Sequence, residues 1–257
     1  MALQLSKAFT DGIDRVTTRT GGILFTLLLV QQFLLLTSLN TVLGAQLPPA
    51  ATDALGLSLP VPRAVASVVL VGAFLFSAVY FVVLSRALTR PKAHLTSFPS
   101  DLYTRRIGWA SITMLVAGVV SAVATIIGFF LLILPGLFLA PHFVFLIFAV
   151  GVEDRGVVGS LKRSWGLAKG NRLRLFVIVF LVAVSGIIIG FVPAVFQFAG
   201  APALGDIASV LLNGILYTVV YGIIAAAYVQ VADDPGDRGP ASTAVSTTSS
   251  GRSNPEL

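Results

Sequence analysis

Charge is what this sequence has least of. Only 11% of its 257 residues are Asp, Glu, Lys or Arg, whereas 56% are hydrophobic, and the mean hydropathy is +0.94. A soluble domain carries about 25% charged residues. The deficit excludes a surface that faces water throughout, so lipid is the solvent for most of the chain. We therefore expect an all-α fold, a polytopic membrane helix bundle.

Cysteine is absent, which excludes disulfides, iron–sulfur clusters and thiol catalysis. Clusters of carboxylates or histidines with the spacing of metal ligands are also missing, and no glycine-rich phosphate loop precedes a helix. We therefore expect no catalytic residues, no metal and no cofactor, and interpret the chain as a non-enzymatic protein.

Six apolar segments predict six transmembrane helices, at about 21–43, 64–88, 107–134, 137–152, 175–198 and 207–231. The third and fourth come from one stretch, 107–152, that has no formally charged side chain. A single helix of that length would measure about 69 Å, more than twice the ~30 Å hydrocarbon core. Pro135-Gly136 is the strongest helix breaker in the stretch, so we place the turn there.

The two flanks of this membrane domain (21–232) differ in kind. Residues 1–20 predict a cytoplasmic amphipathic helix, because apolar residues fall on one side of a helical wheel: Ala2, Leu5, Phe9, Ile13 and Val16. Such a helix lies in the lipid headgroup region or packs on the protein's own cytoplasmic face, and both alternatives stay open. Residues 233–257 are rich in Ser, Thr, Gly and Pro, and we expect a disordered cytoplasmic tail.

Basic residues are distributed very unevenly over the predicted loops. With six spans, sixteen of the seventeen Lys and Arg residues fall on the side of the termini, and Arg63 alone falls on the other. This asymmetry predicts a multi-pass protein of the plasma membrane with both termini in the cytoplasm. It also explains the net charge of +6 without nucleic acid, which we exclude as a partner.

The densest run of charge, 153–174, separates the fourth span from the fifth. Glu153 and Asp154 close the fourth span, and we expect them to form an ion-pair network with Arg155, Lys162 and Arg163. The segment 157–169 predicts a second interfacial amphipathic helix, anchored by Trp165. Membrane lipids are the expected partners, with headgroup contacts from Lys162, Arg163, Lys169, Arg172 and Arg174. A soluble cytoplasmic partner and a homo-oligomer both stay open.

Residues 5–16 and 157–168 share a faint repeat. Leu5, Phe9, Ile13 and Val16 have the spacing of Val157, Leu161, Trp165 and Ala168, and a span follows each set. Parallel repeats occur in transporters, but any inward loop before a span tends to be basic and amphipathic. The sequence leaves these alternatives open.

Ionisable groups are nearly absent from the spans, and such groups are usually functional. The candidate intramembrane polar site consists of Gln31, Gln32, His142 and Asn213. We place His142 in the outer half of the fourth span, as a neutral histidine bonded to a neighbouring helix. One of the adjacent glutamines must face protein. Polar residues of this kind more often join helices, by hydrogen bonds of ~0.6 kcal/mol, than line a path.

The run LPGLFLAPHFVFLIFAVGVEDRGVVGSLKRSWGLAKGNRLRLF carries a family signature. It resembles uncharacterised six-helix membrane proteins related to the membrane domain attached to some glycerophosphodiester phosphodiesterases. The matching elements are Pro135-Gly136, Glu153-Asp154, Ser164-Trp165 and Gly170-Asn171. The Arg- and Asp-rich composition would suit an archaeal, halophile-type member. The resemblance implies a fold and a topology, and it implies no reaction.

Two functions remain from the sequence. The first is an envelope-accessory or lipid-interacting membrane protein that acts through its cytoplasmic amphipathic elements. The second is a small transporter or channel, which would use the neutral polar residues and lack the acids that proton or sodium coupling needs.

Overall fold

The computed structural model describes residues 3–48, 52, 55–131 and 139–232, and within these residues every regular element is helical. The long helices are α2 (Arg19–Gly44), α4 (Arg63–Leu88), α6 (Ile107–Leu131), α10 (Arg172–Gly190) and α12 (Pro202–Ala232). The shorter ones are α1 (Leu5–Val16), η1 (Lys92–His94), α5 (Asp101–Thr104), α8 (Leu146–Gly151), α9 (Val157–Ala168) and α11 (Val192–Phe198).

Five helices are long and apolar enough to cross a membrane: Arg19–Gly44, Arg63–Leu88, Ile107–Gly128, Arg172–Phe198 and Pro202–Ala232. Each corresponds to a predicted span. The remaining prediction, 137–152, corresponds to a shorter apolar helix, Leu139–Gly151. At 1.5 Å per residue this helix is about 20 Å long, less than the ~30 Å core. The Pro135-Gly136 turn and the tail 233–257 lie outside the described residues.

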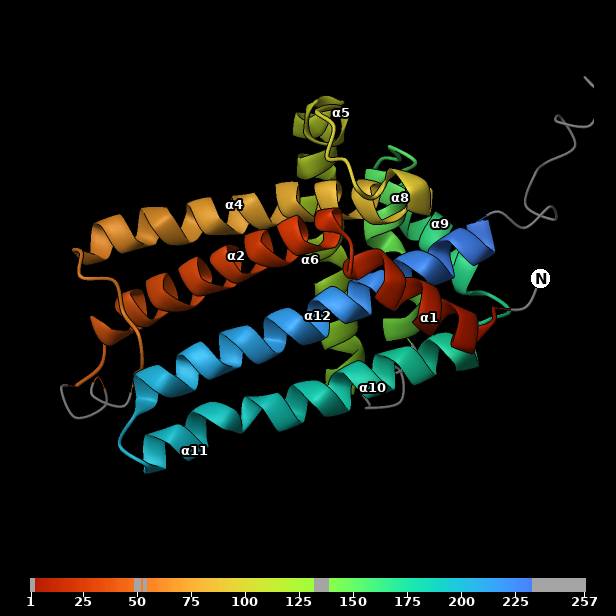
Figure 1. Cartoon of the computed structure of the whole chain (residues 1–257). Coiled ribbons are helices and arrows are strands. Elements are labelled where there is room, and N and C mark those ends of the chain that lie inside the picture. The colour runs from red at the N-terminus through yellow and green to blue at the C-terminus, as the bar shows by residue number, and fades with distance from the viewer. Residues whose placement is uncertain (1–2, 49–51, 53–54, 132–138, 233–257) are drawn as a thin grey trace, which may run out of the picture.

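Four of the long helices lie side by side, in the order α4, α2, α12 and α10 (Figure 1). Helix α11 continues α10 and packs on the first part of α12. Helix α6 runs across this layer, near the end of α4, and it contacts α4, α8 and α9. The chain that leaves the layer through α6 therefore returns to it through α8.

Large apolar side chains cover the outside of the layer. Only 11% of the most apolar 18-residue stretch of α10 and α11 is buried. The exposed large apolar residues of these two helices are Leu173, Val177, Phe180, Leu181, Val184, Ile187, Ile188, Phe191, Val195 and Phe198. A surface of this kind is unstable in water and marks contact with a membrane or a partner. The structure thus agrees with the membrane protein that the composition predicts.

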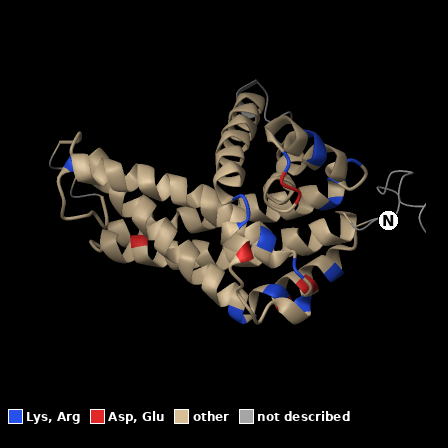
Figure 2. Ribbon diagram, turned by 90° about the horizontal axis from the view of Figure 1, so that it is seen from above, with Lys and Arg blue, Asp and Glu red and all other residues tan. Residues whose placement is uncertain are grey.

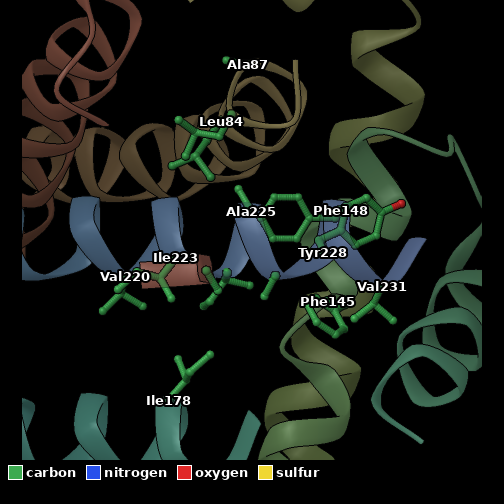
Figure 3. Close-up of a cluster of buried hydrophobic side chains, with 14 of the residues drawn as sticks. Leu84, Ala87, Phe145, Phe148, Ile178, Val220, Ile223, Ala225, Tyr228 and Val231 are labelled. Atoms are coloured by element: carbon green, nitrogen blue, oxygen red, sulfur yellow. The ribbon is translucent and has the colours of Figure 1, made fainter. Parts of the chain in front are cut away.

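A cluster of buried hydrophobic side chains lies where α12 ends beside α4 and α8 (Figure 3). The ring of Phe148 stacks on that of Tyr228, with centroids 5.0 Å apart, and Phe145 lies 5.9 Å from the same tyrosine. Leu84 and Ile223 extend this cluster along α4 and α12. Because it joins segments far apart in the sequence, the cluster fixes this end of the molecule.

Helix α1 packs on α12, so the structure favours the second of the two placements predicted for the N-terminal helix. A Cβ atom added to Gly12 would lie 2.6 Å from the Cα atom of Ile223, and one added to Gly222 would lie 2.5 Å from the Gly12 carbonyl oxygen. Two glycines therefore allow the backbones to touch. A helical wheel of residues 1–20 places Arg15 on the polar side, opposite the apolar residues, yet its side chain is buried and its Nη1 donates to the carbonyls of Leu88 and Arg90.

Candidate functional site at the charged end

Most charged residues of the described chain gather at one end of the bundle (Figure 2), the end that holds α1, α5 and α9 (Figure 1). Arg63, in contrast, begins α4 at the opposite end. Both ends of the described chain lie at the charged end, because the Leu3 amide donates to Asn171 Oδ1 (2.9 Å) and the Gln4 amide donates to Gln230 Oε1 (3.1 Å).

Asp154 links three parts of the chain. It accepts from Arg86 Nη2 at 2.9 Å and pairs with Arg105 Nη2 at 3.1 Å. Its φ of 50° places it in the left-handed region, where Asp is one of the few residues that are tolerated. The remaining nitrogens of Arg86 donate to the carbonyls of Gly151, Leu102 and Arg105. The buried guanidinium thereby holds the end of α8 against α4 and α5.

The neighbouring acid, Glu153, joins α9 to α12. Its carboxylate accepts from Arg163 Nε (2.8 Å), Arg155 Nε (2.5 Å) and the Tyr228 hydroxyl (2.7 Å). Burial raises the pKa of Glu153, but the hydrogen bonds from Tyr228, Arg163 and Arg155 outweigh it and leave the pKa below its ordinary value. The predicted pairs with Arg155 and Arg163 are present, whereas Lys162 is exposed instead.

Each carboxylate therefore pairs with two arginines, and the hydrogen bonds from Tyr228, Arg163 and Arg155 keep Glu153 ionised. A carboxylate in that state suits the joining of helices better than proton transfer, which needs a pKa close to the working pH. Among the residues that the structure describes, no three His, Asp or Glu side chains come together in a way that could hold a metal ion. We therefore interpret this cluster of ion pairs as a structural contact that holds the helices together.

His142 lies against α9 and not in the outer half of a span, so that placement was wrong. Its ring centroid is 4.0 Å from that of Trp165, and its carbonyl accepts from Ser164 Oγ at 2.6 Å. The physical reason is the shortness of the helix Leu139–Gly151, which keeps residue 142 near the charged end. His142 is fully buried, while Trp165 keeps 37% of its surface exposed.

The predicted headgroup contacts divide into three groups, of which Lys162 alone forms the third and lines a separate hollow. Arg163 forms an ion pair with Glu153, and only 18% of its side chain is exposed. Lys169, Arg172 and Arg174 line a 540 Å³ cavity together with Gly170, Asn171 and Leu173. Gly170, at φ 97°, makes the turn from α9 into α10. The Asn171 side chain faces inward and accepts from Leu3, so it holds the turn to the N-terminal segment.

A second hollow is lined by α6, the helix Leu139–Gly151 and α9. Val120, Phe143, Leu161 and Trp165 form its apolar walls and Lys162 the polar part of its lining, around 350 Å³. An apolar hollow with one cation suits an amphipathic molecule such as a lipid, with its chain against the walls and its anionic head near the ammonium group.

The structure does not bring the four candidate intramembrane residues together. Gln31 Nε2 donates to Ser77 Oγ of α4 at 2.7 Å, so this glutamine joins two helices. Gln32 and Asn213 do share a groove between α2, α4 and α12. His142 lies elsewhere, beside Trp165.

Sequence reasoning missed a joint at the opposite end, at Asp206. Its Oδ2 accepts from the Leu57 amide (2.7 Å) and from Asn40 Nδ2 (3.2 Å), which fastens the α2–α4 connection to α12. Gly56 lies so close to this carboxylate that a side chain would not fit. The signal in the sequence is an acid near the start of an otherwise apolar helix.

A family model described as "Domain of unknown function (DUF7847)" matches residues 3–231. The chain belongs to this family. The match extends over the helices that the structure describes, from α1 almost to the end of α12, so the family's domain includes α1. No curated protein and no solved structure matches the chain.

Proposed function

We propose that this protein is a non-enzymatic, lipid-interacting protein of the plasma membrane, and that its charged end binds anionic lipid headgroups from the cytoplasmic side. The observation that carries the proposal is the cavity lined by residues 169–174. It combines three cationic side chains with a strongly exposed leucine, at the end of the bundle where basic residues gather.

The order of side chains along this turn supports the proposal. Leu173 is 83% exposed and stands between Arg172 and Arg174 at the start of α10. An apolar side chain at the start of α10 is stabilised when it enters the acyl region of the bilayer, while the neighbouring arginines stay among the headgroups. Each basic residue close to an anionic leaflet contributes about 1 kcal/mol.

The proposed topology has both termini in the cytoplasm. The four helices of the layer bring the chain back to the charged end, and α6 with Leu139–Gly151 leaves and returns at that same end. The termini therefore share one side whether or not this hairpin crosses the bilayer. In the six-span arrangement that the sequence predicts, the hairpin supplies the third and fourth crossings, whereas in Figure 1 α6 runs across the four helices of the layer. The resemblance to the phosphodiesterase-associated membrane domain enters this proposal only as support for that arrangement.

The transporter alternative has weaker support from the geometry. Within the described residues, Gln31 is bonded to Ser77, His142 is packed on Trp165, and Gln32 with Asn213 lines a groove on the layer. These positions do not form a common polar path between the two ends.

Binding of phosphatidylglycerol and phosphatidylcholine to the detergent-solubilised protein tests the proposal. We expect the double variant Lys169→Glu, Arg174→Glu to lose at least about tenfold in affinity for phosphatidylglycerol, given about 1 kcal/mol per basic residue. Arg63→Glu, at the opposite end, is the matched control and should bind as the wild type does. An equal loss in both variants, or none in the double variant, would exclude a headgroup site at 169–174.

A further inference from the structure

The groove that Gln32 and Asn213 share is a separate feature of the layer. It has a volume of 470 Å³, within the range of small-molecule sites. Each of three helices contributes one face to the lining. On α4, Leu70 and Phe74 are one turn apart, and on α12, Ser209 and Asn213 are one turn apart. The residues of one face of α2 are Gln32, Leu35, Leu36 and Leu39. The groove therefore has three walls, formed by side chains of α2, α4 and α12.

Most of this lining is apolar, and none of it is charged: the apolar members are Leu35, Leu36, Leu39, Leu70, Phe74 and Val210. A charged ligand would lose its hydration here without gaining a counter-ion, which is strongly unfavourable. A hydrocarbon body, in contrast, matches these walls. The occupant is therefore uncharged over the part that the groove holds.

Two polar atoms of the lining lack partners. Gln32 Nε2 and Ser209 Oγ are both buried, and neither makes a hydrogen bond. A buried donor without an acceptor is costly, and native proteins rarely keep one unless a further group satisfies it. An oxygen acceptor on a ligand would satisfy the Gln32 amide.

The position of Gln32 along α2 limits which lipids could place an oxygen atom beside it. It lies thirteen residues from Arg19, the first residue of α2, and twelve from Gly44, the last. At 1.5 Å per residue this is about 20 Å from the charged end, close to the middle of the helix. The headgroups of phospholipids lie at the surfaces of the ~30 Å core, so they do not reach this level. The acceptor must belong to a lipid whose polar oxygen sits deep in the bilayer.

We propose that the groove binds an uncharged, long-tailed lipid with a ketone-type carbonyl, such as an isoprenoid quinone, through a hydrogen bond from Gln32 Nε2 to the carbonyl oxygen. The tail lies along the leucines of α2 and against Leu70 and Phe74. Asn213 and Ser209 supply polar contacts on the α12 side. This site is independent of the headgroup surface at the charged end.

The two adjacent glutamines provide a matched pair of variants. The Gln31 side chain donates a hydrogen bond to Ser77, whereas Gln32 lines the groove. The purified protein is illuminated with decylbenzophenone, an aromatic ketone that cross-links on irradiation, and the labelled peptides are located by mass spectrometry. Decyl-benzoquinone and decylbenzene, which has no carbonyl, then compete for the site.

We expect cross-links on the α2 and α12 residues of the groove, and competition about tenfold more effective by the quinone than by decylbenzene. Gln32→Leu should remove this preference and keep the labelling by the apolar body, whereas Gln31→Leu should keep the preference. Each variant must first match the wild type in its elution volume on size exclusion and in its unfolding transition, which shows that it is folded. A preference that survives Gln32→Leu, or cross-links outside the groove, would overturn the proposal.

A second copy of the chain is the other possible occupant, and it has its own signature. The chain has no cysteine, so Leu36→Cys carries a single thiol in the groove. Disulfide-linked dimers of that variant in membranes, together with no labelling of the wild type by the probe, would show an interface between copies and refute the lipid site. Because these measurements involve neither Lys169 nor anionic lipid, their failure would leave the headgroup proposal untouched.

Discussion

Arg86 donates to Asp154 across 68 positions of sequence, with 2.9 Å between Nη2 and Oδ1, and only 5% of Arg86 is exposed. The same guanidinium donates to three backbone carbonyls. In the linear sequence, Arg86 is one of several basic residues at and beyond the end of the second predicted span. In the structure it fastens the returning hairpin to the layer.

Replacing Arg86 by leucine should therefore destabilise the protein by about 3–5 kcal/mol, because it leaves Asp154 and three carbonyls without their donor. Arg86→Lys should recover little, since an ammonium group lacks the planar fork of a guanidinium. Denaturant unfolding in detergent measures both. Arg90→Leu is the control, because Arg90 bonds Ser97 at an exposed site, and a comparable loss there would contradict the assignment.

The stability of the protein should fall in acid because of Glu153. Its pKa is lowered in the folded state from an ordinary value of 4.5. Its contribution is therefore complete above about pH 5 and is lost as the pH falls through the lowered pKa. Glu153→Gln should be less stable than the wild type at pH 7, and the difference should shrink as the pH is lowered. Unfolding midpoints across pH 3–7 measure this, with exposed Asp101→Asn as control; a constant difference would refute the role.

The contact of α1 with α12 predicts a sharp difference between two glycines. Gly12→Leu should destabilise the protein by about 1–3 kcal/mol, because the new side chain meets the backbone of α12. Gly22→Ala, where a Cβ meets nothing within 4 Å, should be neutral or slightly stabilising. The measurements are the unfolding midpoint and the rate at which protease cleaves within residues 3–16. If Gly12→Leu left that rate unchanged, α1 would not depend on this contact.

The absence of cysteine makes the topology easy to test. Ser58, in the connection between α2 and α4, and Thr104, in α5, are both exposed. On intact cells a membrane-impermeant maleimide should label Ser58→Cys and should leave Thr104→Cys unlabelled until the cells are opened. The reverse pattern would invert the orientation proposed from the basic residues.

Apolar composition predicted the helices well, and it did so for a simple reason. A segment such as 64–88 has no charged residue before Arg86, so its character is visible in any window of the sequence. The predicted span 137–152 differs from the described helix in length. Its apolar run was visible, but the described helix is shorter than a bilayer requires. The length of the run of 46 uncharged residues requires a turn within it. It does not predict how the resulting hairpin packs on α4.

The site was harder to predict. Sequence reasoning singled out Glu153 and the turn 169–174, because charged residues are conspicuous in this chain. It missed that Arg15 and Arg86 are buried, and that Asp206 binds the α2–α4 connection. The partners of these three residues are backbone groups and side chains far away in sequence, which spacing along one helix does not reveal.

The sequence by itself determined that this protein is helical, apolar and strongly asymmetric in charge, because hydropathy and the positions of basic residues are local properties of the chain. Only the tertiary structure decided which polar groups are used. It gave Gln31 a partner in Ser77 and left Gln32 beside an apolar groove, although the two are neighbours. The physical reason is the 100° turn between successive helical residues, which directs adjacent side chains to different neighbours.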